Sequence, residues 1–173
     1  QAMISSSLLL CVALASQDLP AHAAESLGID EEQPIIDGVI DEPLWGRIEP
    51  LTGLKQVLPD NGAPASERTE VRFCFGPDEL FIAVSCFDSE PLKIREVNMA
   101  RDANLNADDR FELLFDTFND DRNAFWFQMS AAGSRGDALI TKNGSSFNKP
   151  WNGLWRGRST VTDDGWFAEL AIP

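Results

Sequence analysis

The sequence has few of the residues that catalysis or nucleic-acid binding would need. It contains a single histidine, His22, and 28 acidic residues against 14 basic ones. It has no G-x-S-x-G elbow, and a Cys–His pair would depend on that one histidine. The net charge of −14 at pH 7 would repel nucleic-acid phosphates and anionic lipid. These absences argue against a nucleophilic hydrolase and a nucleic-acid-binding protein, and leave neutral sugars, cations or basic partners as compatible ligands.

The sequence also lacks an apolar run long enough to cross a bilayer. Its most apolar stretch, residues 4–15, is short and is followed by Ala21-His22-Ala23, the small-x-small pattern of a signal-peptidase site. We therefore expect residues 1–23 to be a signal peptide, 24–34 a linker and 35–173 one domain. The alternative for the first segment is a buried hydrophobic helix. A cleaved signal predicts an exported protein of the periplasm, the outer membrane or the extracellular space.

Cysteine is scarce, and only Cys74 and Cys86 would remain after cleavage. An oxidising compartment would permit a disulfide between them. However, a turn at residues 76–78 pairs position 74 with about position 81, several residues from Cys86, whereas bridged Cα atoms must approach within about 7 Å. The sequence alone leaves this bridge open.

Helical periodicity is almost absent, and the one helix candidate is short, residues 41–47, with Asp41 as its cap and Pro43 in its first turn. Strand patterns dominate instead, and turn-forming residues separate most of them. The expected strands are residues 68–75, 80–87, 110–115, 124–130, 137–141, 154–161 and 166–172. Residues 51–58 are ambiguous. Strands at this spacing predict an all-β fold, an antiparallel β-sandwich of the jelly-roll or immunoglobulin-like kind. Because the last strand ends at Pro173, we expect the sandwich to be truncated at its C-terminal end.

The alternation of side chains along two expected strands defines one candidate binding patch. Arg110 and Glu112 share one face of residues 110–115, and Trp126 and Gln128 share one face of residues 124–130. If the two strands are neighbours, the four side chains combine an aromatic ring with planar carboxylate, amide and guanidinium groups, which suit the C–H faces and hydroxyls of a sugar.

The other tryptophans fall into two groups. Trp151, in the loop-like sequence NKPWNG, and Trp155 are further candidates for a platform that stacks on a sugar. Trp45 and Trp166 are expected to be structural, because one follows the short helix candidate and the other alternates with apolar strand residues.

The acidic residues are candidates for two other kinds of site. Asp116, Asp120 and Asp121 are candidate ligands for a structural Ca²⁺, although they do not follow EF-hand spacing, and the alternative is a solvated acidic turn. Asp109 and Glu112 could suggest a glycosidase pair, but they lie three residues apart on opposite faces of one strand. They cannot flank one glycosidic bond, so we expect a domain that is not an enzyme.

Four segments, in order, resemble family 9 carbohydrate-binding modules. They correspond to a DG-x-x-D-E-x-x-W opening, a hairpin, a D-x-x-E-x-x-x-D strand and a G-W-x-x-E-x-x-I-P ending, found here at residues 36–45, 69–83, 109–116 and 164–173. The resemblance spans residues 35–173. It implies a jelly-roll-like sandwich that holds glucan or xylan chains, often with structural calcium. Residues 115–123 are most similar to a branch in which the module precedes an outer-membrane β-barrel region.

The resemblance also implies roles for single residues. Glu112 matches a carboxylate that contacts sugar hydroxyls, and Asp109 matches an acid of the same motif. Asn106 stands where the family has an aromatic platform, and Gln128 where it has an arginine. Arg110, on the face of Glu112, is a candidate replacement for that guanidinium.

The leading hypothesis is therefore an exported, non-catalytic carbohydrate-binding domain, covalently linked to a further C-terminal region. One alternative is a structural periplasmic domain of an outer-membrane barrel protein, without sugar affinity. Another is an accessory module of a glycoside hydrolase whose catalytic carboxylates lie elsewhere in the chain.

Overall fold

The structure is a computed structural model that describes residues 24–28 and 31–173. Its elements in these residues are nine strands and one 3₁₀ helix, η1 (Pro91–Lys93). The strands are β1 (Glu25–Ser26), β2 (Thr69–Phe75), β3 (Leu80–Phe87), β4 (Arg110–Phe115), β5 (Ala124–Ser130), β6 (Arg135–Thr141), β7 (Ser146–Asn148), β8 (Arg156–Thr162) and β9 (Gly165–Ile172). The expected all-β fold is confirmed, and the strands form two sheets, as in a β-sandwich.

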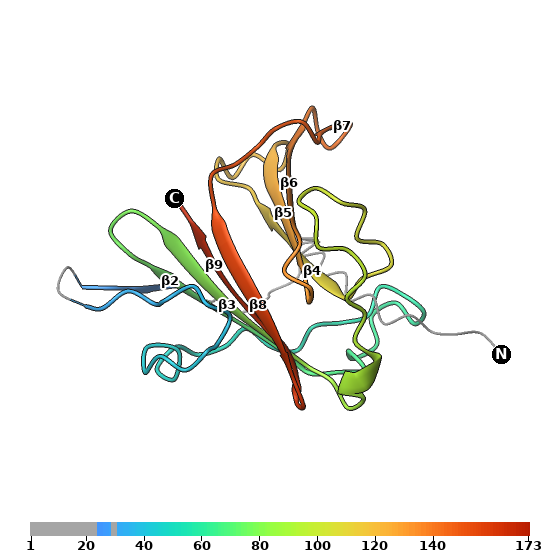
Figure 1. Ribbon diagram of the computed structural model, residues 1–173. Helices are drawn as coiled ribbons and strands as arrows, with labels where there is room; N and C mark the ends of the chain where they lie inside the picture. Colours follow the sequence, from blue (N-terminus) through green and yellow to red (C-terminus); the bar gives the residue numbers. More distant parts are fainter. Residues whose placement is uncertain (1–23, 29–30) are drawn as a thin grey trace. The chain divides into compact units, whose positions relative to one another are not determined.

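The strands form two sheets, which belong to two compact units of the chain (Figure 1). The central unit, residues 95–153, contains a sheet of order β4-β5-β6-β7, all antiparallel. The flanking unit, residues 24–28, 31–94 and 154–173, contains a sheet of order β1-β2-β3-β9-β8, antiparallel except for the β1–β2 pair.

Each of the seven expected strands is present, with ends within two residues of the expected ones. The prediction of a short helix at residues 41–47 is wrong, because the segment is a series of turns. Trp45 N donates to Glu42 O and Arg47 N donates to Leu44 O, each over 3.0 Å and each between residues three apart in sequence. Pro43 supplies no N–H and Gly46 favours an irregular backbone, so the segment does not continue into a helix.

The hairpin of β2 and β3 places the two cysteines apart. Cys74 pairs with Phe81, the position expected from the turn, whereas Cys86 pairs with Thr69. By alternation the two thiols lie on opposite faces of the sheet, five positions apart in register. Both are buried, and this geometry excludes a disulfide between them.

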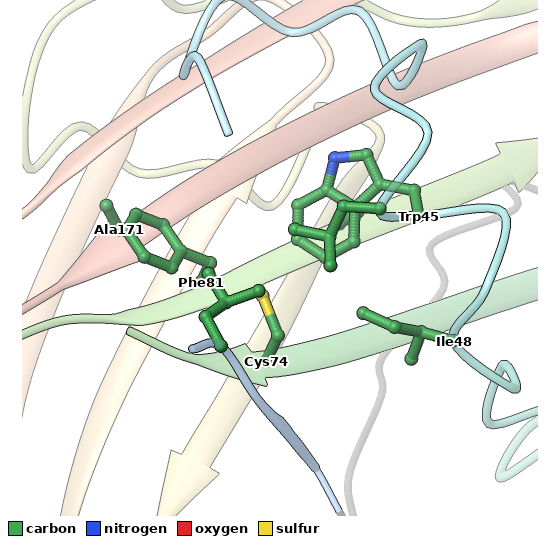
Figure 2. Close-up of a cluster of buried hydrophobic side chains, with 8 residues drawn as sticks. Trp45, Ile48, Cys74, Phe81 and Ala171 are labelled. Atoms are coloured by element: carbon green, nitrogen blue, oxygen red, sulfur yellow. The ribbon is translucent and has the colours of Figure 1, made fainter. Parts of the chain in front are cut away.

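The flanking sheet carries a hydrophobic cluster on the face to which Cys74 points (Figure 2). Trp45, 2% exposed, lies over this face together with Ile48, while Cys74, Phe81 and Ala171 come from the strands. Since the opposite face of the same strands is also buried, β3 reads as a nearly continuous apolar run rather than as an alternating one.

Part of the expected linker joins the fold. β1 pairs in parallel with β2, and Leu27 donates its backbone N–H to Phe75 O at 2.8 Å. The Leu27 side chain is 7% exposed and belongs to the hydrophobic cluster. A two-residue strand is too short for a periodic pattern, so β1 could not be predicted from the sequence.

A buried carboxylate ties the turn segment to the sheet. Glu169 of β9 is fully buried, and it accepts hydrogen bonds from Trp45 Nε1 at 3.0 Å, Gly38 N at 3.0 Å and Asp37 N at 3.2 Å. Gly38 has φ of +90°, and a Cβ there would meet the Ser159 backbone at 2.9 Å, so the position requires glycine. The expected structural role of Trp45 is confirmed.

The environment of Glu169 favours the neutral form more than water does. Burial raises the pKa of Glu169 to about 7, and the neighbouring Glu42 carboxylate acts in the same direction, against the lowering effect of the hydrogen bonds from Gly38, Trp45 and Asp37. The same segment therefore gains three hydrogen bonds and carries the cost of burying a carboxylate.

The predicted signal peptide, residues 1–23, lies outside the described residues. Within residues 24–28 and 31–173, no helix has the length and apolar character that crossing a membrane would require.

Candidate functional site

One face of the β4–β7 sheet brings the expected patch together. The register places Glu112 of β4 beside Gln128 of β5, and Gln128 beside Gly136 of β6. Trp126, two positions from Gln128, shares its face by alternation. The neighbouring positions predicted for Glu112, Trp126 and Gln128 are therefore present in the structure.

Glu112 is held in a fixed orientation by two neighbours. Arg110 Nε donates to Glu112 Oε1 at 2.8 Å, and Trp126 Nε1 donates to Glu112 Oε2 at 3.1 Å. Arg110 Nη1 also donates to Leu105 O at 2.7 Å. The Arg110 and Glu112 side chains are 11% and 12% exposed, so the ion pair is largely sheltered but still reached by solvent. Because a carboxylate oxygen can accept more than one hydrogen bond, Glu112 can still accept from a ligand hydroxyl.

The exposed aromatic group of this face is Phe147 rather than Trp126. Trp126 is 8% exposed, with the Phe147 ring 5.2 Å from it at 68° and Lys149 Nζ 4.7 Å above it. Phe147 is 53% exposed. Sequence reasoning missed Phe147 and Lys149, since β7 is only three residues long and its pairing with β6 leaves no periodic signal.

Gln128 is packed into the sheet face rather than projecting from it. The side chain is 5% exposed, and a Cβ at Gly136 would lie 2.5 Å from Gln128 Nε2 and 2.9 Å from Lys149 Nζ. Glycine at position 136 therefore makes room for the amide and the ammonium group together. Gln128 therefore packs within this face and does not reach solvent.

The other two candidate tryptophans do not join this face. The Trp151 ring lies 5.2 Å from that of Phe125 and 6.2 Å from that of Phe127, both of which point to the opposite face of the sheet. Trp155 belongs to the flanking unit and is 6% exposed. Their surroundings are those of packing residues.

A buried ion pair holds the loop around Trp151. Asp137 of β6 is fully buried, and its Oδ2 accepts from Arg101 Nη2 at 2.6 Å and from Gly153 N at 3.1 Å. Arg101 Nη2 also donates to Asn152 Oδ1. Asp137 could be predicted only as a strand residue, because nothing in its local pattern identifies the distant Arg101 as its partner.

The acidic turn between β4 and β5 is organised by its own backbone. Asp116 accepts from the amides of Phe118 and Asp121 at 3.1 and 2.8 Å, and Asp120 accepts from those of Arg122 and Asn123 at 2.8 and 2.9 Å. The Arg122 amide, followed by the side chain and amide of Asn123, lowers the pKa of Asp120. Within the described ranges, no group of three or more His, Cys, Asp or Glu side chains is arranged to hold a metal ion.

Another acid of this unit, Asp108, is 1% exposed and anchors the preceding loop. Its Oδ1 accepts from Val97 N and Asn98 N at 2.7 and 2.8 Å, and its Oδ2 accepts from Asn98 Nδ2 at 2.7 Å. Burial alone would raise the pKa of Asp108, but these hydrogen bonds outweigh it and hold the pKa below its usual value. Asp108 therefore has a structural role, because it holds the loop at residues 97–98.

Calcium at the acidic turn stays a prediction, and Asp116, Asp120 and Asp121 could ligate it only by exchanging some of their amide hydrogen bonds for the ion. If calcium binds there, EDTA will lower the melting temperature and added Ca²⁺ will restore it, because an ion that binds only the folded state stabilises it. Asp116→Asn should abolish the response. A melting temperature that EDTA leaves unchanged would contradict calcium binding at this turn.

Comparison with solved structures gives the fold. The chain is similar to a family 9 carbohydrate-binding module from Caldicellulosiruptor kristjanssonii in complex with glucose: TM-score 0.59 and 12% identity, over 86% of this chain and 68% of that one. The same module in complex with cellotriose gives TM-score 0.61 and 13% identity over 86% and 65% of the two chains. A candidate carbohydrate-binding protein from Bacteroides uniformis gives 0.59 and 14% over 87% and 73%.

The chain has a family 9-like fold. At these identities the likeness shows the fold alone, and this chain spans about two thirds of the modules from C. kristjanssonii. No protein-family model and no curated protein sequence matches the chain.

Proposed function

We propose that this chain is a carbohydrate-binding domain without catalytic activity, and that its site is the face of the β4–β7 sheet around Glu112. The observation that carries the proposal is the combination on one face of an oriented carboxylate, Glu112, and an exposed aromatic ring, Phe147. A sugar presents hydroxyls to the former and C–H groups to the latter. The fold likeness to sugar-bound modules supports the same assignment.

The contacts suggest a division of roles. Arg110 and Trp126 hold Glu112 in position, so they act through that carboxylate, and Lys149 stands beside the Trp126 ring as a further donor. Phe147 supplies the aromatic platform that was predicted at Trp126, Trp151 or Trp155. An exposed ring beside an oriented carboxylate suits a glucan or xylan chain, which is the ligand class that we propose.

Binding of cello- and xylo-oligosaccharides, measured by isothermal titration calorimetry, tests the proposal. Glu112→Gln should weaken the association constant about tenfold, because a hydrogen bond to a charged group contributes about 1.5 kcal/mol or more. Phe147→Ala should weaken it by a similar factor through loss of stacking.

Phe118→Ala is the matched control, since Phe118 is 74% exposed in the same unit but lies in the acidic turn. It should bind as the unaltered protein does. The proposal fails if the unaltered protein shows no heat at millimolar oligosaccharide, or if all three variants bind alike.

Three predictions concern the larger protein: that it is exported, that it carries an outer-membrane barrel region, or that this domain is an accessory module of a glycoside hydrolase. The last two differ in the sequence that they require beyond residue 173. A barrel requires alternating apolar strands, and a hydrolase requires a domain with catalytic carboxylates.

A further inference from the structure

The flanking unit contains a cavity of about 650 Å³ that is separate in sequence and sheet from the proposed sugar site. Its floor consists of residues of β2, β3, β8 and β9, and its wall is the turn segment of residues 38–46. The register places Ser85 beside Phe167, and Phe167 beside Thr160, so these floor residues form one row across the sheet. The volume lies within the range of about 300–1,000 Å³ typical of small-ligand sites.

The apolar part of the floor is a pair of aromatic rings. Phe87 and Phe167 meet edge to face, with ring centres 5.7 Å apart, and both side chains are partly exposed. The guanidinium carbon of Arg68 lies 3.6 Å from the Phe87 ring centre, so this ring already attracts a cation. The hydroxyl groups of Thr160 and Ser85 stand in the same row and offer both donors and acceptors.

The charged groups of the cavity are mainly acidic. Its lining residues include three acids, Asp41, Glu42 and Asp164, and one basic residue, Arg72. The Arg68 guanidinium, stacked on the lining ring of Phe87, is a second positive charge beside it. Arg72 Nη2 already pairs with Glu70 Oε2 at 2.9 Å, and its Nε donates to the Ile48 carbonyl at 3.2 Å. Glu70 also pairs with Arg68, so two guanidinium groups stand against four carboxylates, those of Asp41, Glu42, Glu70 and Asp164. This excess of acidic groups favours a ligand that carries positive charge.

We propose that this cavity binds a saccharide unit that carries an ammonium group, an amino sugar. The rings of Phe87 and Phe167 match the C–H surface of the sugar ring, and the hydroxyl row matches its hydroxyl groups. The carboxylates at positions 41 and 164, both exposed, attract the ammonium group. A neutral sugar would use the rings and hydroxyls but gain nothing from the excess of carboxylates.

Two tryptophan indole signals make the test specific. Trp45 lines the cavity and its indole N–H is bound to Glu169, whereas the Trp126 indole N–H is bound to Glu112 at the other site. In ¹H–¹⁵N spectra, the fully deacetylated glucosamine trimer should shift the Trp45 indole and the Thr160 and Thr162 amides. Cellotriose, the neutral counterpart of this trimer, should bind at least about tenfold more weakly when the same signals are titrated. Added salt should weaken binding of the amino sugar.

Charge-neutral variants separate the cavity from general attraction to an acidic protein. Asp41→Asn combined with Asp164→Asn should weaken binding of the glucosamine trimer at least about tenfold, since each carboxylate contributes to holding the ammonium group. Asp163→Asn is the matched control, because Asp163 is exposed in the same β8–β9 turn but does not line the cavity. It should leave binding unchanged.

The inference is overturned if the glucosamine trimer leaves the Trp45 indole unmoved, if cellotriose shifts it equally, or if Asp163→Asn weakens binding as much as the double variant. These outcomes do not bear on the β4–β7 site, whose failure would appear as a Trp126 indole that no neutral oligosaccharide shifts. Glu112→Gln should leave the response of Trp45 intact.

Discussion

Trp45→Ala is expected to lower the free energy of unfolding by about 4 kcal/mol, the usual range for removal of a buried tryptophan. The indole is 2% exposed, packs on Ile48, Cys74 and Phe81, and donates its N–H to Glu169 at 3.0 Å (Figure 2). The alanine variant would leave a cavity in this cluster and would also remove one of the three donors that surround a buried carboxylate. Urea unfolding followed by circular dichroism measures the loss.

Trp45→Phe separates the two effects, because it retains most of the buried ring and removes only the donor. It should cost about 1–3 kcal/mol, the penalty for a buried group that loses its hydrogen bond together with a small change in volume. Equal stability of the unaltered protein and the alanine variant would show that the turn segment does not pack on the sheet as described.

The unfolding free energy should also fall by about 3 kcal/mol between about pH 4.5 and pH 7 because of Glu169 alone. The pKa of Glu169 is raised from 4.5 to about 7 by burial, so the folded state binds its proton more tightly than the unfolded state. The stabilising contribution of the proton is complete below about pH 4.5 and is lost as the pH rises through about 7. Urea midpoints across this interval provide the measurement.

Glu169→Gln is the control for this pH dependence, because an amide keeps the shape and cannot ionise. The variant should lose the slope between about pH 4.5 and 7, although one amide hydrogen would face a backbone or indole N–H and lower its stability at acid pH. The carboxyls of Asp108 and Asp120 have lowered pKa values, so they titrate below this interval. An identical slope in both proteins would assign the pH dependence to other groups.

The strands of the fold could be predicted because their signals are local. Alternation of apolar residues and the turn formers between them defined seven strands to within two residues, and the turn at residues 76–78 correctly placed Cys74 opposite Phe81. The same alternation put Glu112, Trp126 and Gln128 on one face. Such properties follow from the geometry of one strand or one hairpin.

The exposed part of the site could not be predicted in this way. Trp126 was proposed as a platform, but pairing of β6 with β7 brings Phe147 and Lys149 against it, and the exposed ring is that of Phe147. Trp151 packs on the opposite face, through contacts with Phe125 and Phe127. Which side chain covers another depends on strand neighbours that a periodic pattern does not identify.

The carboxylates show the same division. Glu112, Asp137 and Glu169 all occur in strands, and nothing in their local sequence separates them. Glu112 forms an ion pair with Arg110, and Asp137 forms one with Arg101. Burial, with the Glu42 carboxylate nearby, instead raises the pKa of Glu169.

By itself, therefore, the sequence determined the all-β class, the positions of the strands and the side of each strand on which polar residues stand, because period-two geometry is a property of the backbone. Only the tertiary structure decided that Leu27 belongs to a cluster, that burial and the Glu42 carboxylate raise the pKa of Glu169, and that Phe147 is the accessible ring. Burial and electrostatic environment are sums over residues distant in sequence, and they exist only once the strands are paired.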